Sequence, residues 1–175
     1  AIVLFGLLGP LFTGDPRNAD FDPLLPPSLE HPFGTTKLGY DVLAQVATGT
    51  QGSLFVGVVA GVVSLVLALV FGVLAGYFGG VLDETLMLLT NIMLVIPGLP
   101  LVMVIAAYVQ HTEGLGALAR SSLLVALVLG VTGWAGSAVV LRGTARSLRT
   151  RDCVAAAVVA GERPMRVIFV EILPN

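Results

Sequence analysis

The chain has 175 residues, of which 56% are hydrophobic and 11% charged, and its formal net charge at pH 7 is −2. Because soluble domains carry about 25% charged residues, this composition argues against a soluble enzyme, a disordered protein and a nucleic-acid-binding protein, and indicates an all-α membrane protein. The single cysteine, Cys153, excludes a disulfide framework and a cysteine-rich metal site.

The first apolar run covers residues 1–12 and is shorter than the roughly 20 residues that a helix needs to cross a bilayer. Pro10 interrupts the run, and the chain starts without Met. We therefore expect this run to be the distal end of a spanning helix whose beginning is missing. The alternative is a signal-peptide hydrophobic region, which the lack of a preceding basic stretch and of an A-x-A site disfavours.

Residues 13–52 are polar and are expected to form a loop outside the membrane. The loop begins as a coil rich in Pro and Asp and passes through a turn at residues 31–35. From Lys37 onward, apolar residues recur every four positions, which predicts a short amphipathic helix on the outer membrane surface. His31 has no partner near it in the sequence and is interpreted as structural rather than as a metal ligand.

Three long apolar runs follow, at about 54–78, 86–109 and 121–141, and each is long enough to cross a membrane as a helix. None contains an ionisable residue, whereas proton-coupled carriers and ion channels usually keep such groups at depth. The runs also lack the G-x-S-x-G and H-E-x-x-H motifs of hydrolases. The sequence therefore argues against ion-gradient coupling and against an intramembrane enzyme.

The run at 54–78 carries two GxxxG pairs, Gly57–Gly61 and Gly72–Gly76. Small residues at this spacing let helix backbones approach each other closely in lipid. Packing within a helical bundle is the favoured interpretation, and a specific dimerisation face is the alternative.

The run at 86–109 contains Pro97 and Pro100, which flank Gly98 and should kink or unwind the helix. A break of this kind either lines a translocation path or is a packing kink, and the sequence leaves both open. Asn91 is a polar residue in the same run. Asn91, Pro97 and Pro100 are therefore the candidate pore-lining residues.

The segment 142–175 holds six of the nine basic residues of the chain, all of them arginine. By the positive-inside rule this end is cytoplasmic and the acidic loop at 13–52 is outside. The segment is expected to continue the last span as a basic helix and then to form a helix–turn–helix. Thr150 is the predicted cap of the first short helix, Gly161 its C-terminal residue and Pro164 the start of the second.

The second short helix should have one apolar face, formed by residues spaced i, i+3, i+4 and i+7. These residues are Met165, Ile168, Phe169 and Ile172. Glu162 and Arg166 are one turn apart and are expected to pair. The apolar face must pack on the membrane surface, on the rest of the bundle or on a cytosolic partner.

Three motifs resemble the permease subunits of binding-protein-dependent ABC importers, in the dipeptide/oligopeptide/nickel branch. Residues 31–42 (HPFGTTKLGYDV) resemble that family's outer loop, and residues 75–83 (AGYFGGVLD) resemble its A-G-Y-F-G-G-x-x-D stretch. Residues 155–161 (AAAVVAG), followed by ILPN at the end of the chain, resemble its cytoplasmic E-A-A-x-x-x-G loop. The likeness runs from about residue 31 to the end.

The resemblance implies the polytopic helical bundle of a type I importer permease in a bacterial or archaeal plasma membrane. The subunit would pair with a second, homologous permease to form the pore. Two ATP-binding subunits would bind ATP and Mg²⁺, a substrate-binding protein would face the outer loop, and this chain would bind no cofactor, metal or nucleic acid and catalyse nothing. The residues implied to dock the ATPase are Ala155, Ala156, Ala157, Gly161, Arg166 and Pro174.

The chain departs from the family pattern at several charged positions, and the family glutamate of the E-A-A motif falls on Ala155. A degenerate permease copy or a non-transporting membrane scaffold is therefore the alternative function. The family also has two further spanning helices after the I-L-P-N end, so we expect the chain to be a fragment cut at both ends.

Overall fold

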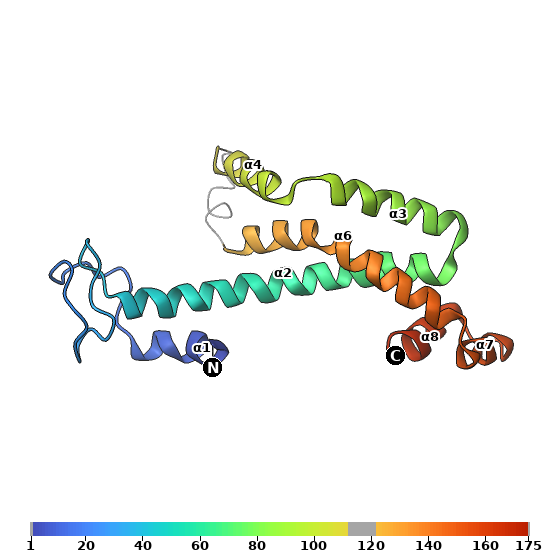
Figure 1. Cartoon of the computed structure of the whole chain (residues 1–175), viewed down its shortest axis with the longest axis horizontal. Helices are drawn as coiled ribbons and strands as arrows, with labels where there is room; N and C mark the ends of the chain where they lie inside the picture. Colours follow the sequence, from blue (N-terminus) through green and yellow to red (C-terminus); the bar gives the residue numbers. More distant parts are fainter. Residues whose placement is uncertain (1, 112–121, 175) are drawn as a thin grey trace. The chain divides into compact units, whose positions relative to one another are not determined.

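A computed structural model describes residues 2–111 and 122–174, and their regular structure is helical (Figure 1). The chain divides into two compact units, Ala1–Val58 and Val59–Asn175. The long helix α2 (Val42–Phe78) contributes its first part to one unit and its remainder to the other.

The first unit contains α1 (Ile2–Phe12), the loop that follows it and the beginning of α2. The helix includes Pro10, which cannot donate a backbone hydrogen bond and lies two residues before the helix ends at Phe12. Gly6 and Gly9 allow α1 to approach α2: a Cβ at Gly6 would lie 2.4 Å from Leu54, and one at Gly9 would lie 3.0 Å from Ala47.

The prediction of a separate amphipathic helix before a span at 54–78 is wrong, because the structure has one helix from Val42 to Phe78. No proline lies within this range, and its glycines weaken a helix without ending it. Asp41 precedes the helix, and its carboxylate accepts a hydrogen bond from the backbone N–H of Ala44, which fixes the start.

In the second unit, the predicted span at 86–109 is also corrected. The structure has two helices there, α3 (Gly80–Val95) and α4 (Gly98–His111), separated at Ile96 and Pro97. Ile96 has an extended backbone with ψ of 122°, as expected for a residue that precedes proline. The predicted interruption is therefore confirmed, and it divides the run into helices of 16 and 14 residues.

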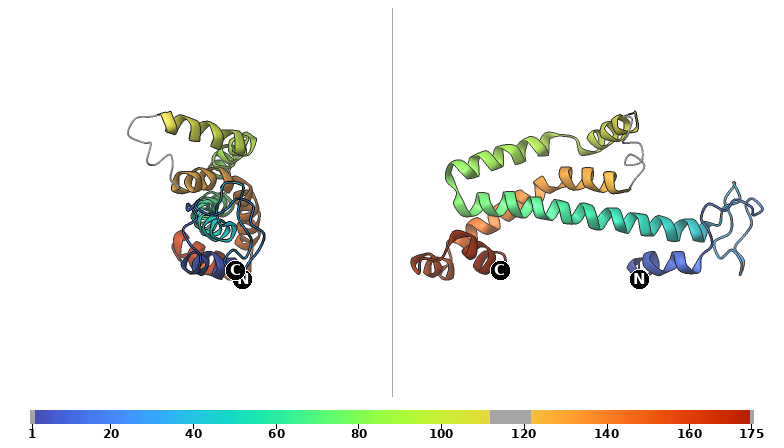
Figure 2. Two further views of the ribbon diagram at one scale, coloured as in Figure 1. Left: turned by 90° about the vertical axis from the view of Figure 1, so that its left-hand side faces the viewer. Right: turned by 180° about the vertical axis from the view of Figure 1, so that it is seen from behind.

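Helix α6 (Ser122–Arg149) lies alongside α3 in both views of the ribbon (Figures 1 and 2). It packs closely on the end of α2 at Gly72 and Gly76, where an added Cβ would lie 2.5 Å and 2.6 Å from the carbonyl oxygens of Ala138 and Arg142. This GxxxG pair therefore packs within the bundle. At Gly61 an added Cβ would meet no atom of the described residues within 4 Å.

The chain beyond α6 forms α7 (Asp152–Val159), α8 (Pro164–Val167) and a π-helical segment, η1 (Ile168–Ile172). The predicted helix–turn–helix is thus confirmed, with Pro164 in the first turn of α8. The predicted cap is wrong: Arg151 occupies the N-cap position, and the hydroxyl of Thr150 donates instead to the carbonyl of Ser147 at the end of α6.

Among the described residues, α2 and α6 are long and apolar enough to cross a membrane. α1, α3 and α4 are shorter apolar helices of 11, 16 and 14 residues. Whether α1 is the end of a longer spanning helix stays a prediction.

Candidate functional site

The turn between α7 and α8 is built around Gly161. Its φ of +80° is a left-handed conformation that glycine adopts without steric cost. The N–H of Gly161 donates to the carbonyl of Val158, and the N–H of Glu162 donates to that of Ala157. This pair of bonds is the Schellman arrangement, which satisfies the last carbonyl groups of α7. The predicted role of Gly161 at the helix end is confirmed, and it gives α7 and α8 a fixed connection.

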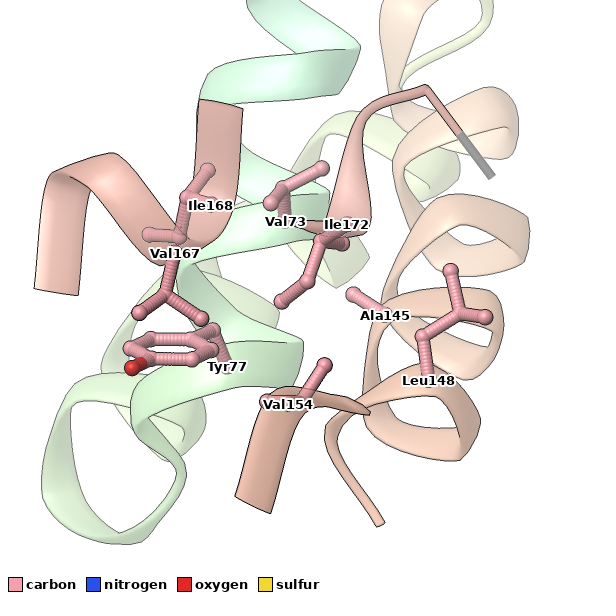
Figure 3. Close-up of a cluster of buried hydrophobic side chains, with 8 residues drawn as sticks. All are labelled: Val73, Tyr77, Ala145, Leu148, Val154, Val167, Ile168 and Ile172. Atoms are coloured by element: carbon pink, nitrogen blue, oxygen red, sulfur yellow. The ribbon is translucent and has the colours of Figure 1, made fainter. Parts of the chain in front are cut away.

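A buried apolar cluster holds this turn against the ends of α2 and α6 (Figure 3). In Figure 3, Val167 of α8 lies over the ring of Tyr77 of α2. The full set of buried members is Val73, Tyr77, Ala145, Leu148, Val154, Val167, Ile168 and Ile172. Because these residues come from five helical segments, a displacement of the turn must move the ends of α2 and α6 or break the cluster.

The apolar face predicted for residues 165–172 is partly wrong. Ile168 and Ile172 are buried, but Met165 and Phe169 are exposed, and Val167 is buried in their place. Val167 lies in α8, and the π-helical segment η1 begins one residue later, at Ile168. The buried side is therefore formed by Val167, Ile168 and Ile172 rather than by the four positions that the predicted spacing selects.

The candidate docking residues lie on this turn, and most of them are exposed. Ala155, Ala156 and Gly161 are at the surface, whereas Ala157 is half-buried against the apolar cluster. Pro174 follows η1 and is exposed. The structure thus gathers five of the six candidates on α7, α8 and their connecting turn, with Pro174 beyond η1.

Arg166 makes the predicted ion pair with Glu162, with an N–O distance of 3.2 Å. The pair borders a groove of about 310 Å³ between α7 and the α8–η1 segment. Small side chains, Ala156 and Ala160 among them, form much of the remaining wall, with Cys153 beside them. The exposed side of α7 is therefore apolar, and Val159 is 88% exposed.

The candidate pore residues gather at the interruption between α3 and α4. Pro97 occupies the gap, Pro100 lies in the first turn of α4, and Asn91 lies in the last turns of α3; all three are exposed. A separate apolar pocket of about 240 Å³ faces α6 at this level, and Met93 and Ile96 contribute to it. The interruption therefore combines exposed polar and proline residues with an apolar contact to α6.

An ion pair between Asp83 and Arg142 joins α3 to α6 and is not apparent from the sequence. Arg142 donates from Nε and Nη2 to the two carboxylate oxygens of Asp83, at 2.5 and 2.6 Å. Asp83 is buried in the first turn of α3, where a negative charge is also stabilised by the helix dipole. The sequence signals are that Asp83 and Arg142 each stand at the edge of an apolar run and that Asp83 ends the A-G-Y-F-G-G-x-x-D stretch.

The loop of the first unit contains a second buried polar contact. Nδ1 of His31 lies 2.7 Å from Oδ2 of Asp41, ten positions further along the chain. This contact supports the interpretation of His31 as a structural residue. Burial acts to raise the pKa of Asp41, but the hydrogen bond with His31 and the backbone N–H groups of Ala44 and Leu43 together lower it. His31 also packs edge-on against Phe21, with a ring centroid distance of 4.4 Å.

No group of three or more His, Cys, Asp or Glu side chains lies close enough to hold a metal ion within the described part of the chain. The arrangement offers helix ends, a fixed turn and apolar surfaces.

The chain matches the family model described as "Binding-protein-dependent transport system inner membrane component" over residues 68–175. It is 34% identical over 169 residues to the oligopeptide transport system permease protein OppC of Mycobacterium tuberculosis, covering 96% of this chain and 56% of that protein. It is 39% identical over 152 residues to the dipeptide transport system permease protein DppC of Bacillus subtilis, covering 86% of this chain and 44% of that protein.

A third relative, OppC of Escherichia coli, is 37% identical over 145 residues, covering 83% of this chain and 45% of that protein. The chain thus spans about half the length of these relatives, all of which are named as permease proteins rather than as enzymes. The matched region contains the end of α2, the α3–α4 interruption, α6 and the turn at Gly161. The chain belongs to the family of inner membrane components of binding-protein-dependent transport systems.

Proposed function

We propose that this chain is part of a pore-forming permease subunit of an ATP-driven importer for peptides or a related small solute. The observation that carries the proposal is the turn at Gly161, which the buried cluster joins to α2 and α6 while it leaves α7 exposed. An exposed element that is fixed to two long apolar helices suits the transmission of movement from a docked partner.

In this proposal the turn lies in the cytoplasm and docks an ATP-binding subunit through Ala155, Ala156, Ala157, Gly161, Arg166 and Pro174. ATP and Mg²⁺ bind to two such partner subunits, and this chain binds neither. A second, homologous permease completes the pore, and a substrate-binding protein meets the loop at 13–52. Asn91, Pro97 and Pro100 line the pathway of the solute.

Co-purification of the ATP-binding subunits with the full-length permease tests the docking claim. Val159→Lys changes an exposed position of α7 without disturbing the buried cluster, so it should lose the ATP-binding subunits. Leu29→Lys is the matched control, because Leu29 is fully exposed in the loop at 13–52 and should have no effect. Equal recovery of ATP-binding subunits with both variants would contradict docking at α7, and no recovery with the wild-type permease would favour a non-transporting scaffold.

The orientation is tested by thiol labelling in intact cells. Cysteines placed at Asp20 and at Arg146 should react from opposite sides of the membrane, with Asp20 accessible from outside, because basic segments stay in the cytoplasm. Labelling of both positions from the same side would contradict the proposed topology.

A further inference from the structure

The ion pair between Asp83 and Arg142 is a directional contact between α3 and α6. Nε of Arg142 donates to Oδ1 of Asp83 at 2.5 Å and Nη2 donates to Oδ2 at 2.6 Å, which fixes the planes of the two groups relative to each other. Asp83 is only 8% exposed, so water competes little for its carboxylate. The two residues are 59 positions apart in the chain, so the pair ties together helices that the sequence does not connect closely.

On the α3 side, the backbone before Asp83 leaves the helix direction weakly constrained. Gly79 and Gly80 form the turn from α2, with φ of +67° and +57°. Two consecutive glycines can adopt many backbone conformations, because neither carries a Cβ that restricts them. The direction of α3 therefore depends on its contacts with α6 rather than on its connection to α2.

On the α6 side, Arg142 lies next to the part of the helix that holds the turn at Gly161. Ala145 and Leu148 follow Arg142 by three and six residues, and both are buried in the cluster with Val167 and Ile172. Six residues of helix span about 9 Å. One short stretch of α6 thus contacts α8 and η1 on one side and Asp83 on the other.

At its far end, α3 stops at Ile96, where the interruption begins, and its contacts with α6 there are apolar. Met93 and Ile96 face Leu127 and Val131 across a pocket of about 240 Å³. Apolar contacts are non-directional and permit sliding, whereas a bidentate ion pair does not. The pair is therefore the contact that sets how α3 follows a displacement of α6.

We propose that the Asp83–Arg142 ion pair is a positioning link that stays closed during transport and makes α3, with the α3–α4 interruption, move together with α6. The inference rests on the proposed function, since it assigns to this pair the transfer of movement from the turn at Gly161 to the pathway. Neither residue touches the solute; both act through the helix that they hold.

The test uses the complete transporter, with the full-length permease, in proteoliposomes, and measures peptides imported per ATP hydrolysed. Asp83→Asn, Arg142→Gln and the double variant should each lower this ratio about fivefold or more, while ATP hydrolysis continues. The double variant leaves no unpaired charge, so it carries the test if a single variant fails to assemble. A double variant with the wild-type ratio would overturn the proposal.

Arg149→Gln is the matched control, because it removes the same charge from α6 two turns later, and Arg149 has no ion pair among the described residues. A purely structural role of Asp83 would lower import and hydrolysis together through the amount of assembled transporter and leave the ratio unchanged. Wild-type transporter that imports no peptide would contradict the proposed function itself, whereas normal wild-type import with unchanged variant ratios contradicts only the link.

A reducible thiol cross-linker separates a permanent link from a latch that must open. In a cysteine-free background with Cys153→Ser, the pair Asp83→Cys and Arg142→Cys is bridged by a short bifunctional reagent. Import per ATP should rise after bridging, because a covalent tie replaces the ion pair. Import that stops after bridging and returns on reduction would overturn the proposal, since α3 and α6 would then have to separate.

Discussion

Asp41 joins the turn at residues 31–35 to the first turn of α2, with one carboxylate oxygen for each. Oδ2 lies 2.7 Å from Nδ1 of His31, and Oδ1 accepts a hydrogen bond of 3.0 Å from the N–H of Ala44. The two contacts explain why a histidine and an aspartate ten positions apart occur in this loop. They also make Asp41 the residue whose loss should open the loop.

Asp41→Ala should lower the free energy of local opening by about 1.5–3 kcal/mol, because it removes a helix cap and a buried hydrogen bond. Hydrogen exchange of the backbone amides of Thr35 and Thr36 measures this opening. Asp20→Ala is the control, since Asp20 is exposed and its carboxylate makes no described contact. Equal exchange in the two variants would contradict the bridging role of Asp41.

The loop should also respond to acid in a defined direction. The pKa of Asp41 is lower in the folded loop than its ordinary value of 3.8, so its stabilising contribution is complete above about pH 3.8. The contribution is lost as the pH falls below that value and through the folded-state pKa. Exchange protection, corrected for its intrinsic pH dependence, should be constant down to about pH 4 and then fall. Asp41→Ala should abolish the decrease that the wild type shows below about pH 4.

Gly76→Ala should destabilise the full-length permease by about 1–3 kcal/mol, because the added methyl group would lie 2.6 Å from the carbonyl oxygen of Arg142. Gly61→Ala, the same change in the same helix, should be neutral or stabilising, since nothing described lies within 4 Å and alanine favours a helix. Thermal unfolding in detergent compares the two. A larger loss of thermal stability in Gly61→Ala than in Gly76→Ala would contradict the packing of α2 on α6.

The sequence predicts the helices well where the length of an apolar run and its proline or glycine residues determine the helix boundaries. The interruption at Pro97 and the end of α7 at Gly161 were both predicted, because proline and glycine act through their own backbone. The start of α2 was not predicted, because no breaker separates the amphipathic segment from the span that follows it. Helix boundaries without a local signal depend on contacts that only the fold provides.

The buried face of the last segment was mispredicted for a different reason. Helical spacing selected Met165 and Phe169, but these side chains are exposed and Val167 is buried in their place. The cluster with the ends of α2 and α6 decides which side of the segment is buried, and that contact has no signal in the sequence. The pairs Asp83–Arg142 and His31–Asp41 also escape sequence analysis, since a single chain gives no spacing rule for partners 59 or ten positions apart.

Val167→Ala should lower the stability of the permease by about 1.5–3 kcal/mol, because it removes buried methyl groups that contact the ring of Tyr77. Val170→Ala is the matched control, since Val170 is more than half exposed three residues further along. Thermal unfolding in detergent measures both changes. Equal effects of the two variants would contradict the burial of Val167 in the cluster.

We propose that the full-length permease imports a peptide with energy from ATP rather than from an ion gradient. Proteoliposomes that contain the complete transporter and receive a labelled peptide, the substrate-binding protein and ATP measure this directly. We expect accumulation that requires ATP hydrolysis on the side of Arg146 and Gly161 and that persists when proton and sodium gradients are collapsed. Uptake that an ion gradient drives without ATP, or no uptake by the complete transporter, would contradict it.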